Sequence, residues 1–249
     1  MPGEVWIIGA SRGLGLAMAG LFKARGRTVV GLARRAPDDL QPFDAFVPLD
    51  ASDADAVDDT IHRLYGERPA PDLIVYCAAR VYQGAILDQP ERALRAELDA
   101  NYLGFVRIAR AVASLKPAGS PVRLVATAST LGYVGCPSLD NYSASKAALI
   151  SFARSARREL AGHGVTIQIL SPPHMDNGGA DLRGPQPFSL AWSAGRFVEA
   201  CEGGVKECVL GASNRVLLRL ARLWPALAQR IMDGIGADAL KRGASRTAA

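Results

Sequence analysis

A tyrosine and a lysine at helical spacing are the residues of this chain best suited to acid–base chemistry. Tyr142 and Lys146 lie four residues apart, near the start of a long apolar helical pattern. On a helix this spacing puts both side chains on one face, one turn apart. A free phenol has a pKa of about 10, which a neighbouring ammonium lowers because its charge favours the phenolate. The pair therefore predicts a proton donor with a pKa moved towards neutrality.

A serine upstream could complete this site. Ser129 follows the apolar run 122–127, which has the composition of a buried strand. Its hydroxyl could hold a carbonyl oxygen beside the phenol. Tyrosine and lysine at this spacing are also common on helix surfaces, where they only pack, so the prediction depends on the elements that position the three side chains.

The first of these elements is a glycine-rich turn between a strand at 5–9 and a helix at 16–25. Its glycines follow the spacing Gly-x-x-x-Gly-x-Gly. Glycines let a turn approach a pyrophosphate closely, and the helix N-terminus behind them offers unpaired N–H groups. An ordinary glycine-rich turn is the alternative, but the strand–turn–helix context favours dinucleotide binding. The residues expected to contact the dinucleotide here are Gly9, Ser11, Arg12, Gly13, Leu14 and Gly15.

Two arginines indicate which dinucleotide binds. The second strand, 28–33, ends at Arg34 and Arg35. An NAD site would carry Asp or Glu about 20 residues beyond the glycines, to bind the ribose 2′-hydroxyl. Arginine instead suits a 2′-phosphate, which Arg12 in the glycine turn can also approach. The sequence thus favours NADP(H); the alternative is that these arginines are solvated surface residues.

The remaining pattern alternates strands with helices. Strands are expected at 46–50, 72–77, 122–127, 165–170 and 207–210, and helices at 53–66, 88–116 with a break near Asn101, 142–162 and 188–201. Apolar parallel strands separated by helices predict an α/β fold, a Rossmann-like doubly wound parallel sheet of about seven strands in three layers. Cofactors bind at the carboxyl ends of such strands. The expected contacts there are Asp50, as acceptor for the adenine amino group, and Ala51, Cys77, Ala78, Ala79 and Pro172.

Composition and charge favour one domain. The 249 residues are 49% hydrophobic, and the net charge of +5 belongs to residues 212–249, so residues 1–211 are neutral. We therefore expect a catalytic domain at 1–211, a helical extension at 212–249 and no nucleic-acid partner. Neither a signal peptide nor an apolar run of 18 residues is present, which predicts a cytoplasmic protein. The cysteines and histidines lack metal-ligand spacing, so no metal is expected.

The extension has a basic amphipathic pattern. Residues 213–232 place apolar side chains on one helical face and arginines beside them, and Pro225 should kink or split the helix. Such a helix can lie on an anionic membrane surface. The alternative is that its apolar face packs on the body or on a second subunit. Residues 237–249 are expected to form a frayed tail.

Taken together, these motifs resemble the short-chain dehydrogenase/reductase family over residues 4–211. The resemblance implies an NADPH-dependent oxidoreductase that moves hydride between nicotinamide and a carbonyl or alcohol, usually as a homodimer or homotetramer. It implies that Tyr142 is the general acid/base and that Ser129 orients the substrate oxygen. Lys146 would hold the nicotinamide ribose and lower the pKa of Tyr142, and Asn101 would hold a water of a proton relay.

The chain differs from the family pattern at several loop positions. Ile8 replaces a threonine, residues 76–79 replace Asn-Asn-Ala-Gly, and Pro173 replaces a glycine. These changes motivate an alternative, a non-catalytic NADP(H)-binding sensor or scaffold; a lyase or epimerase fits the chain length less well. His174 is either a substrate contact or a plain loop histidine. The resemblance places a substrate lid at 175–187, and the apolar extension favours a hydrophobic carbonyl substrate, such as an acyl, polyketide or steroid-like ketone.

Overall fold

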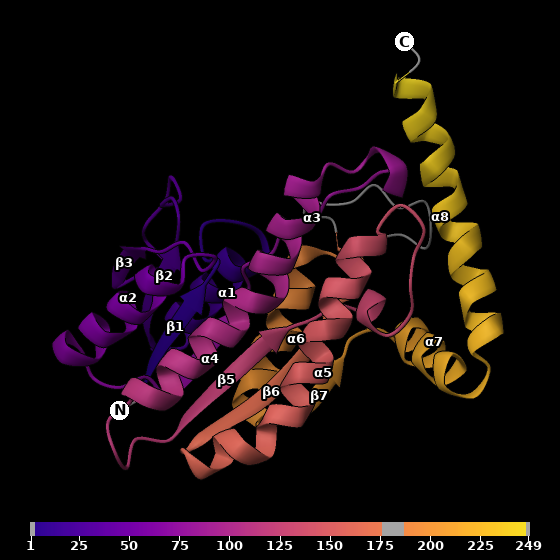
Figure 1. The fold of residues 1–249 in the computed structure, drawn as a ribbon. Coiled ribbons are helices and arrows are strands. Elements are labelled where there is room, and N and C mark those ends of the chain that lie inside the picture. Colours follow the sequence, from indigo (N-terminus) through magenta and orange to yellow (C-terminus); the bar gives the residue numbers. More distant parts are fainter. Residues whose placement is uncertain (1–2, 176–186, 248–249) are drawn as a thin grey trace.

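Seven parallel strands form one twisted sheet (Figure 1). The computed structural model describes residues 3–175 and 187–247, with the backbone alone from 238. The strand order is β3-β2-β1-β4-β5-β6-β7, so the direction of winding changes between β1 and β4. The predicted α/β fold is therefore confirmed. The strands are β1 (Glu4–Ile8), β2 (Thr28–Ala33), β3 (Ala45–Pro48), β4 (Leu73–Tyr76), β5 (Val122–Thr127), β6 (Val165–Ser171) and β7 (Glu207–Val209).

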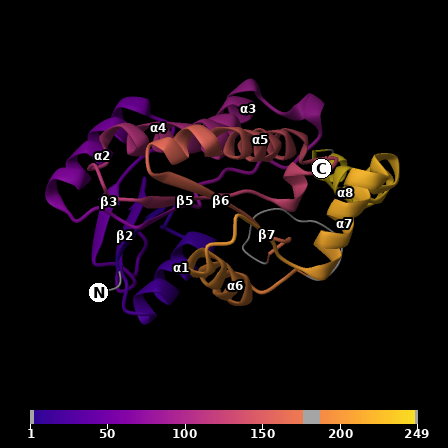
Figure 2. The same ribbon diagram turned by 90° about the horizontal axis from the view of Figure 1, so that it is seen from below.

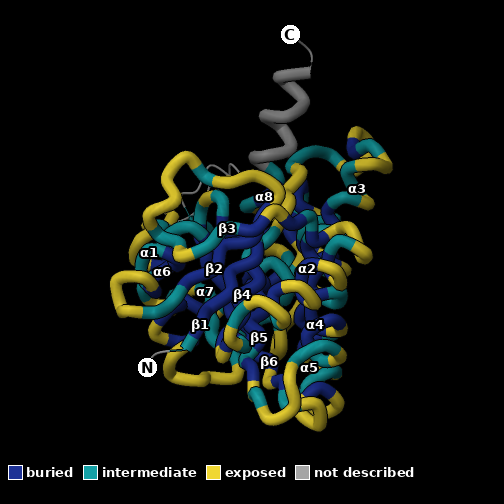
Figure 3. The backbone as a smooth tube through the Cα atoms, turned by 90° about the vertical axis from the view of Figure 1, so that its left-hand side faces the viewer, coloured by how far each residue is buried: buried dark blue, intermediate teal, exposed yellow. Residues whose placement is uncertain are grey.

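Helices cover both faces of the sheet and make the three predicted layers (Figure 2). One face carries α2 (Ala54–Glu67), α3 (Glu91–Leu98), α4 (Gly104–Leu115) and α5 (Asp140–Gly162). The other carries α1 (Gly13–Ala24) and α6 (Leu190–Gly203). Two apolar cores lie between the layers, one on each side of the sheet. Figure 3 shows the central strands buried throughout, which is why they read as continuous apolar runs.

Most predicted boundaries hold to within a few residues, and the differences have local causes. The helix expected from residue 88 begins at Glu91, after Pro90, because Ile86–Asp88 form a separate 3-10 turn. The expected break near Asn101 is a π-helical turn, Asp99–Leu103, that joins α3 to α4. The strand expected at 46–50 ends at Pro48.

The C-terminal extension forms two helices, as Pro225 predicted. They are α7 (Ala212–Leu223) and α8 (Pro225–Thr247). The segment expected to be a tail is helical as far as Thr247, where α8 ends. Its inner side packs on the loop 131–139, where Met232 joins Cys136 and Leu139 in a small apolar cluster. Within residues 3–175 and 187–247, no helix is long and apolar enough to cross a bilayer.

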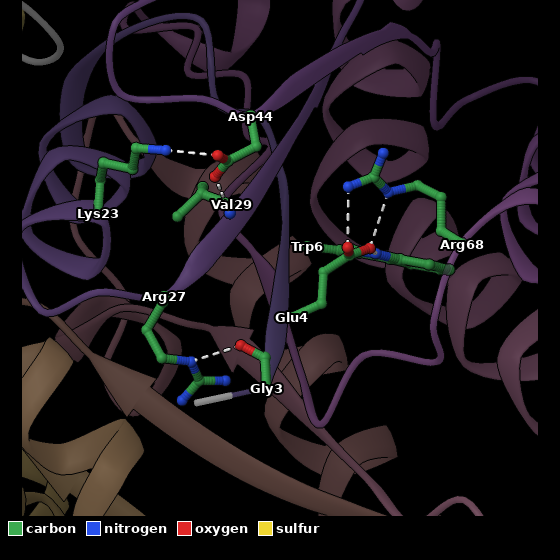
Figure 4. A network of polar contacts seen from close by, with 8 residues as sticks. All are labelled: Gly3, Glu4, Trp6, Lys23, Arg27, Val29, Asp44 and Arg68. Atoms are coloured by element: carbon green, nitrogen blue, oxygen red, sulfur yellow. Dashed lines mark hydrogen bonds and ion pairs between the residues drawn. The ribbon is translucent and has the colours of Figure 1, made fainter. Parts of the chain in front are cut away.

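Ion pairs brace the amino end of the sheet (Figure 4). The buried Glu4 carboxylate accepts two hydrogen bonds from Arg68, at 3.0 and 2.9 Å, and one from Trp6 Nε1 at 2.6 Å. Asp44 bonds Lys23 at 2.5 Å and the Val29 N–H at 2.8 Å. A buried carboxylate is stable only while such partners remain, so this end of the sheet depends on them.

Replacing Arg68 tests that dependence. Arg68→Ala should lower the free energy of unfolding by roughly 3 kcal/mol, because Glu4 would keep its buried charge with only Trp6 as partner. Arg63, on the helix α2 that ends just before Arg68, pairs with Glu67 in solvent at 3.5 Å. Arg63→Ala should therefore cost less than about 1 kcal/mol. Urea unfolding followed by circular dichroism measures both, and equal losses would contradict the assignment.

Candidate active site

The structure brings the predicted tyrosine, lysine and serine together at the carboxyl end of β5. Tyr142 and Lys146 project from the first two turns of α5. Ser129 follows β5 and begins the 3-10 turn Thr130–Gly132, where its Oγ accepts from the Leu131 N–H at 3.2 Å. The Tyr142 and Ser129 hydroxyls are hydrogen-bonded, and Lys146 Nζ lies 5.8 Å from the centre of the Tyr142 ring. Two hydroxyls thus face a position where a substrate oxygen could accept a proton.

The Lys146 ammonium is buried and bonded to the backbone at the end of β5. Lys146 is 2% exposed, and its Nζ donates to the Thr127 carbonyl at 2.9 Å. Burial penalises the charged amine and lowers the pKa of Lys146 to about 8. The carbonyl at the end of β5 therefore fixes an ammonium whose charge is only marginally stable at neutral pH.

The pKa of Tyr142 is raised in this structure, and the expected lowering by Lys146 stays a prediction. Burial raises the pKa of Tyr142 to about 12, and the nearby charge of Glu97 raises it further, against the hydrogen bond with Ser129. The Lys146 ammonium donates to the Thr127 carbonyl and lies over the face of the Tyr142 ring. The phenol is thus held in its neutral, proton-donating form.

Asn101 braces the site from the middle of the π turn. It is fully buried, accepts from the Arg80 N–H at 2.8 Å and donates to the Arg80 carbonyl at 2.9 Å. It also donates to Ser145 Oγ at 2.9 Å, and that hydroxyl donates to the Tyr142 carbonyl at 2.7 Å. Both amide hydrogens of Asn101 are therefore engaged. Its role in a proton relay stays a prediction. Because neither amide hydrogen is free, the water of that relay would have to donate a hydrogen bond to an oxygen acceptor.

The unusual Tyr76 has its own structural partner. Its hydroxyl donates to the Ala100 carbonyl in the π turn at 2.6 Å. A Cβ atom at Gly104 would overlap this hydroxyl, so the large side chain at the end of β4 is matched by a glycine that opens α4. Sequence reasoning missed this pair, although a glycine inside a helical pattern was the available signal.

The glycine turn has the geometry of a phosphate cradle. Gly9 has φ +86°, and a Cβ there would overlap the Ala78 backbone; a Cβ at Gly15 would overlap the Gly9 carbonyl. Gly13 has φ +57° and faces open space. Arg12, at the N-cap of α1, makes no side-chain cap, so the helix N-terminus keeps donors for an anion. The turn thus fits a pyrophosphate.

The other predicted cofactor contacts lie around this turn. Arg12, Arg34 and Arg35 are exposed, whereas Leu14 and Ala51 are buried and could offer only backbone groups. Asp50 accepts from the Ser52 N–H at 3.0 Å and hydroxyl at 2.6 Å. Burial would raise the pKa of Asp50, but these bonds and the Arg34 charge lower it. Ser11, Cys77 and Ala78 are half-buried, Ala79 is exposed, and Pro172 is buried after β6.

The predicted substrate side is described only in part. His174 is half-buried, and its carbonyl accepts from the Phe188 N–H at 3.0 Å. Met175 and Phe188 form a β-bridge, which joins the two ends of the expected lid. Residues 176–186 of that lid lie outside the described residues. No group of three His, Cys, Asp or Glu side chains that could hold a metal occurs in the described part of the chain.

Sequence reasoning also missed a buried carboxylate. Glu97 is 1% exposed and accepts from the Tyr82 N–H at 2.6 Å and from Asn141 Nδ2 at 2.5 Å. The available signal was its position: Glu97 and Asn101 continue the buried helical stripe of Phe105 and Ile108. A polar residue in such a stripe needs buried hydrogen-bond partners, so its side chain is expected to link the helix to neighbouring segments.

Comparisons with known proteins agree with this geometry. A family model for short chain dehydrogenases matches residues 4–183. The 3-oxoacyl-acyl-carrier-protein reductase FabG of Escherichia coli is 26% identical over 172 residues, which cover 67% of this chain and 70% of FabG. The reductase MabA of Mycobacterium bovis, which carries the same enzyme name, is 28% identical over 208 residues, covering 84% of this chain and 82% of MabA.

Solved structures show the same fold. A short-chain dehydrogenase from Streptomyces avermitilis superposes with a TM-score of 0.76 at 27% identity, covering 91% of this chain and 94% of its own. One from Burkholderia cenocepacia, in complex with NADP, has a TM-score of 0.81 at 24% identity, and the match covers 93% of this chain and 98% of the other. Since the family model spans well over half of its residues, the chain belongs to the short chain dehydrogenase family.

Proposed function

We propose that this chain is an NADP(H)-dependent oxidoreductase that moves hydride between nicotinamide and a carbonyl or secondary-alcohol substrate. The observation that carries the proposal is the convergence of Tyr142, Ser129 and Lys146 beside the glycine cradle at one end of the sheet. Two relatives are named as reductases of 3-oxoacyl groups, and one structural neighbour was solved with NADP. The site of this chain has the groups that such a reaction needs.

The cofactor fits the residues present. The uncapped start of α1 and the open face of Gly13 suit a pyrophosphate, and Arg34 with Arg12 suits a 2′-phosphate. NADPH bound there would supply the hydride. Lys146, fixed on the Thr127 carbonyl, would present its remaining N–H donors to the nicotinamide ribose.

The hydroxyl pair would handle the proton. In the reducing direction Ser129 would hold the carbonyl oxygen, and Tyr142 would protonate it as negative charge develops. The raised pKa of Tyr142, about 12, keeps the phenol protonated before the reaction. This favours reduction at neutral pH, because alcohol oxidation would require the phenolate as base.

The surroundings of the phenol indicate an apolar substrate. Tyr142 packs against the small cluster formed by Cys136, Leu139 and Met232, which α8 completes. An apolar wall beside the reacting oxygen suits a 3-oxoacyl thioester or a similar hydrophobic ketone. A sensor or scaffold without catalysis would not need the hydrogen-bonded hydroxyl pair, so no observation favours that alternative.

Removing the phenol hydroxyl tests the catalytic assignment. Tyr142→Phe should lower kcat for a 3-oxoacyl thioester about 10²- to 10⁴-fold, because the general acid is lost, while NADPH still binds. Tyr65→Phe is the matched control, since the Tyr65 hydroxyl lies buried at the opposite end of the sheet and has no hydrogen-bond partner among the described residues. Its turnover should equal that of the parent. Steady-state NADPH oxidation measures both, and unchanged turnover in Tyr142→Phe would contradict the assignment.

Cofactor selectivity tests the two arginines that follow β2. The double change Arg34→Ala and Arg35→Ala should weaken NADPH binding about 10- to 100-fold and leave NADH binding nearly unchanged, because only NADPH carries the 2′-phosphate. Arg25→Ala is the control, because Arg25 pairs with Glu202 at the far end of α1. Fluorescence titration with each cofactor measures the effect. Equal losses for both cofactors would count against the phosphate contact.

We propose that the bend between α7 and α8 is a contact surface for an anionic membrane. Leu223 and Trp224 are 67% and 61% exposed, and Val216, Leu227 and Ile231 are exposed beside them. Leu223, Trp224 and Leu227 line a groove of about 630 Å³. Arg215, Arg219 and Arg222 line the same helix, and of residues 212–237 only Asp233 is acidic. This charge favours an anionic bilayer over a second copy of the same basic surface.

Vesicle flotation distinguishes an anionic bilayer from a second copy of this chain as the partner of the bend. The chain should float with phosphatidylserine-rich vesicles and not with neutral ones, and the double change Leu223→Glu and Trp224→Glu should abolish flotation. Val205→Glu, an exposed apolar position near β7, is the control and should float like the parent. Sedimentation velocity measures the oligomeric state in parallel. Dissociation of an oligomer by the double change, with no flotation of the parent, would show a subunit interface instead.

A further inference from the structure

A buried carboxylate lies beside the candidate active site and has no part in the reaction proposed above. Glu97 projects from the last turn of α3, with both carboxylate oxygens engaged. One oxygen accepts from the Tyr82 N–H, in the chain that follows β4. The other accepts from Asn141, in the first turn of α5, whose Nδ2 also donates to the Leu94 carbonyl at 3.1 Å. The carboxylate thus joins three separate segments.

This junction repeats the one made by Asn101, one helical turn away. Glu97 and Asn101 are four residues apart, and they bind Tyr82 and Arg80, two residues apart on one extended segment. On α5 they bind Asn141 and Ser145, again four residues apart. Each of these lies directly before a member of the candidate site, Tyr142 or Lys146. Two parallel junctions therefore hold the two turns that present the phenol and the amine.

The hydrogen bonds indicate that Glu97 is an anion in the folded protein. Both Tyr82 and Asn141 donate N–H groups to it, which an ionised carboxylate can accept on both oxygens, whereas a protonated one would leave one donor poorly matched. Burial raises the pKa of Glu97 above its usual range, and the bonds from Asn141 and Tyr82 oppose this rise without cancelling it. In the described part of the chain no cation pairs with it within 4.0 Å. Its negative charge therefore acts on the Tyr142 phenol without a neutralising partner.

We propose that Glu97 is a positioning residue for the reaction, which fixes the first turn of α5 and opposes the loss of the Tyr142 proton through its buried charge. The inference rests on the proposed function of Tyr142. It adds to the proposed site a charged side chain, on α3, that acts on the phenol from outside α5 and β5. Ser129 bonds the phenol, Lys146 lies over its ring, and the charge of Glu97 acts on it. The apolar cluster completed by α8 packs against the ring, and the carboxylates beside that cluster are Asp140 and Asp233.

The sign of the effect follows from charge. A negative charge near a phenol disfavours the phenolate, so Glu97 raises the pKa of Tyr142. Its removal should lower that pKa. Ketone reduction, which needs the phenol, would then fall off at a lower pH, and alcohol oxidation, which needs the phenolate, would begin at a lower pH.

The test is an ultraviolet titration of phenolate in Glu97→Gln, which removes the charge and keeps the shape. Six tyrosines absorb, so each titration is repeated with Tyr142→Phe added, and the difference isolates the Tyr142 step. We expect that step to move to lower pH by about 0.5 to 2 units. The pH profile of kcat should move in the same direction. Glu91→Gln, at an exposed ion pair on the same helix, is the control and should move neither.

Two further variants separate charge from position. Glu97→Asp keeps the charge on a shorter side chain, so kcat should fall while the Tyr142 titration stays near that of the parent. Glu97→Met removes the charge with an apolar side chain of similar length, and it replaces Glu97→Gln if the latter does not fold. An unchanged Tyr142 titration in the charge-removing variants would overturn the proposal. A shifted titration in a chain that reduces no carbonyl compound would support it and count against the proposed function instead.

Discussion

The burial of the Lys146 ammonium is the constraint on which the carboxyl end of the sheet depends. An ammonium out of water needs a fixed acceptor, and the Thr127 carbonyl at the end of β5 provides it at 2.9 Å. This bond fixes the distance between β5 and α5, and with it the position of Ser129 relative to Tyr142. The turn that carries Ser129 passes close to Lys146, where a Cβ at Gly132 would overlap the Lys146 backbone. The positions of the Ser129 and Tyr142 hydroxyls therefore depend on the buried Lys146 ammonium, in the second turn of α5.

The polar groups at the two ends of the sheet have different roles. At the amino end, Glu4 and Arg68 satisfy one another, and the polar groups serve only stability. At the carboxyl end, polar groups are buried with partners drawn from several segments, and the backbone adopts less common conformations. Ser138, which is buried just before α5, has φ +69°, and the π turn interrupts the helix that carries Asn101. Such local strain is typical of functional sites, because the surrounding fold must enforce it.

Much of this arrangement could be predicted from the sequence. The apolar strands, the glycine turn and the split at Pro225 depend on local composition, and local composition is what a sequence displays directly. The meeting of Ser129, Tyr142 and Lys146 followed from the rule that strand ends share one edge. The contacts of Glu97, Asn141 and Tyr76 could not be predicted in the same way, because each joins segments whose relative positions only the fold determines. The acceptor of the Lys146 ammonium could not be predicted for a related reason, since helical spacing gives the proximity of the amine to Tyr142 but not the atom that it bonds.

The π turn at Asp99–Leu103 also has a consequence for how this helix can vary. A π turn accommodates one residue more than an α turn, and one residue corresponds to a rotation of about 100° around the axis. Glu97 and Asn101 bond groups beside the site, Phe105 and Ile108 pack in the core, and their spacing of four, four and three residues puts all four on one buried side of the helix. A deletion here would straighten the helix and turn one of the two sets away from its partners. Point substitutions in this segment are therefore tolerable at exposed positions, whereas any change of length would separate the site from the core beneath it.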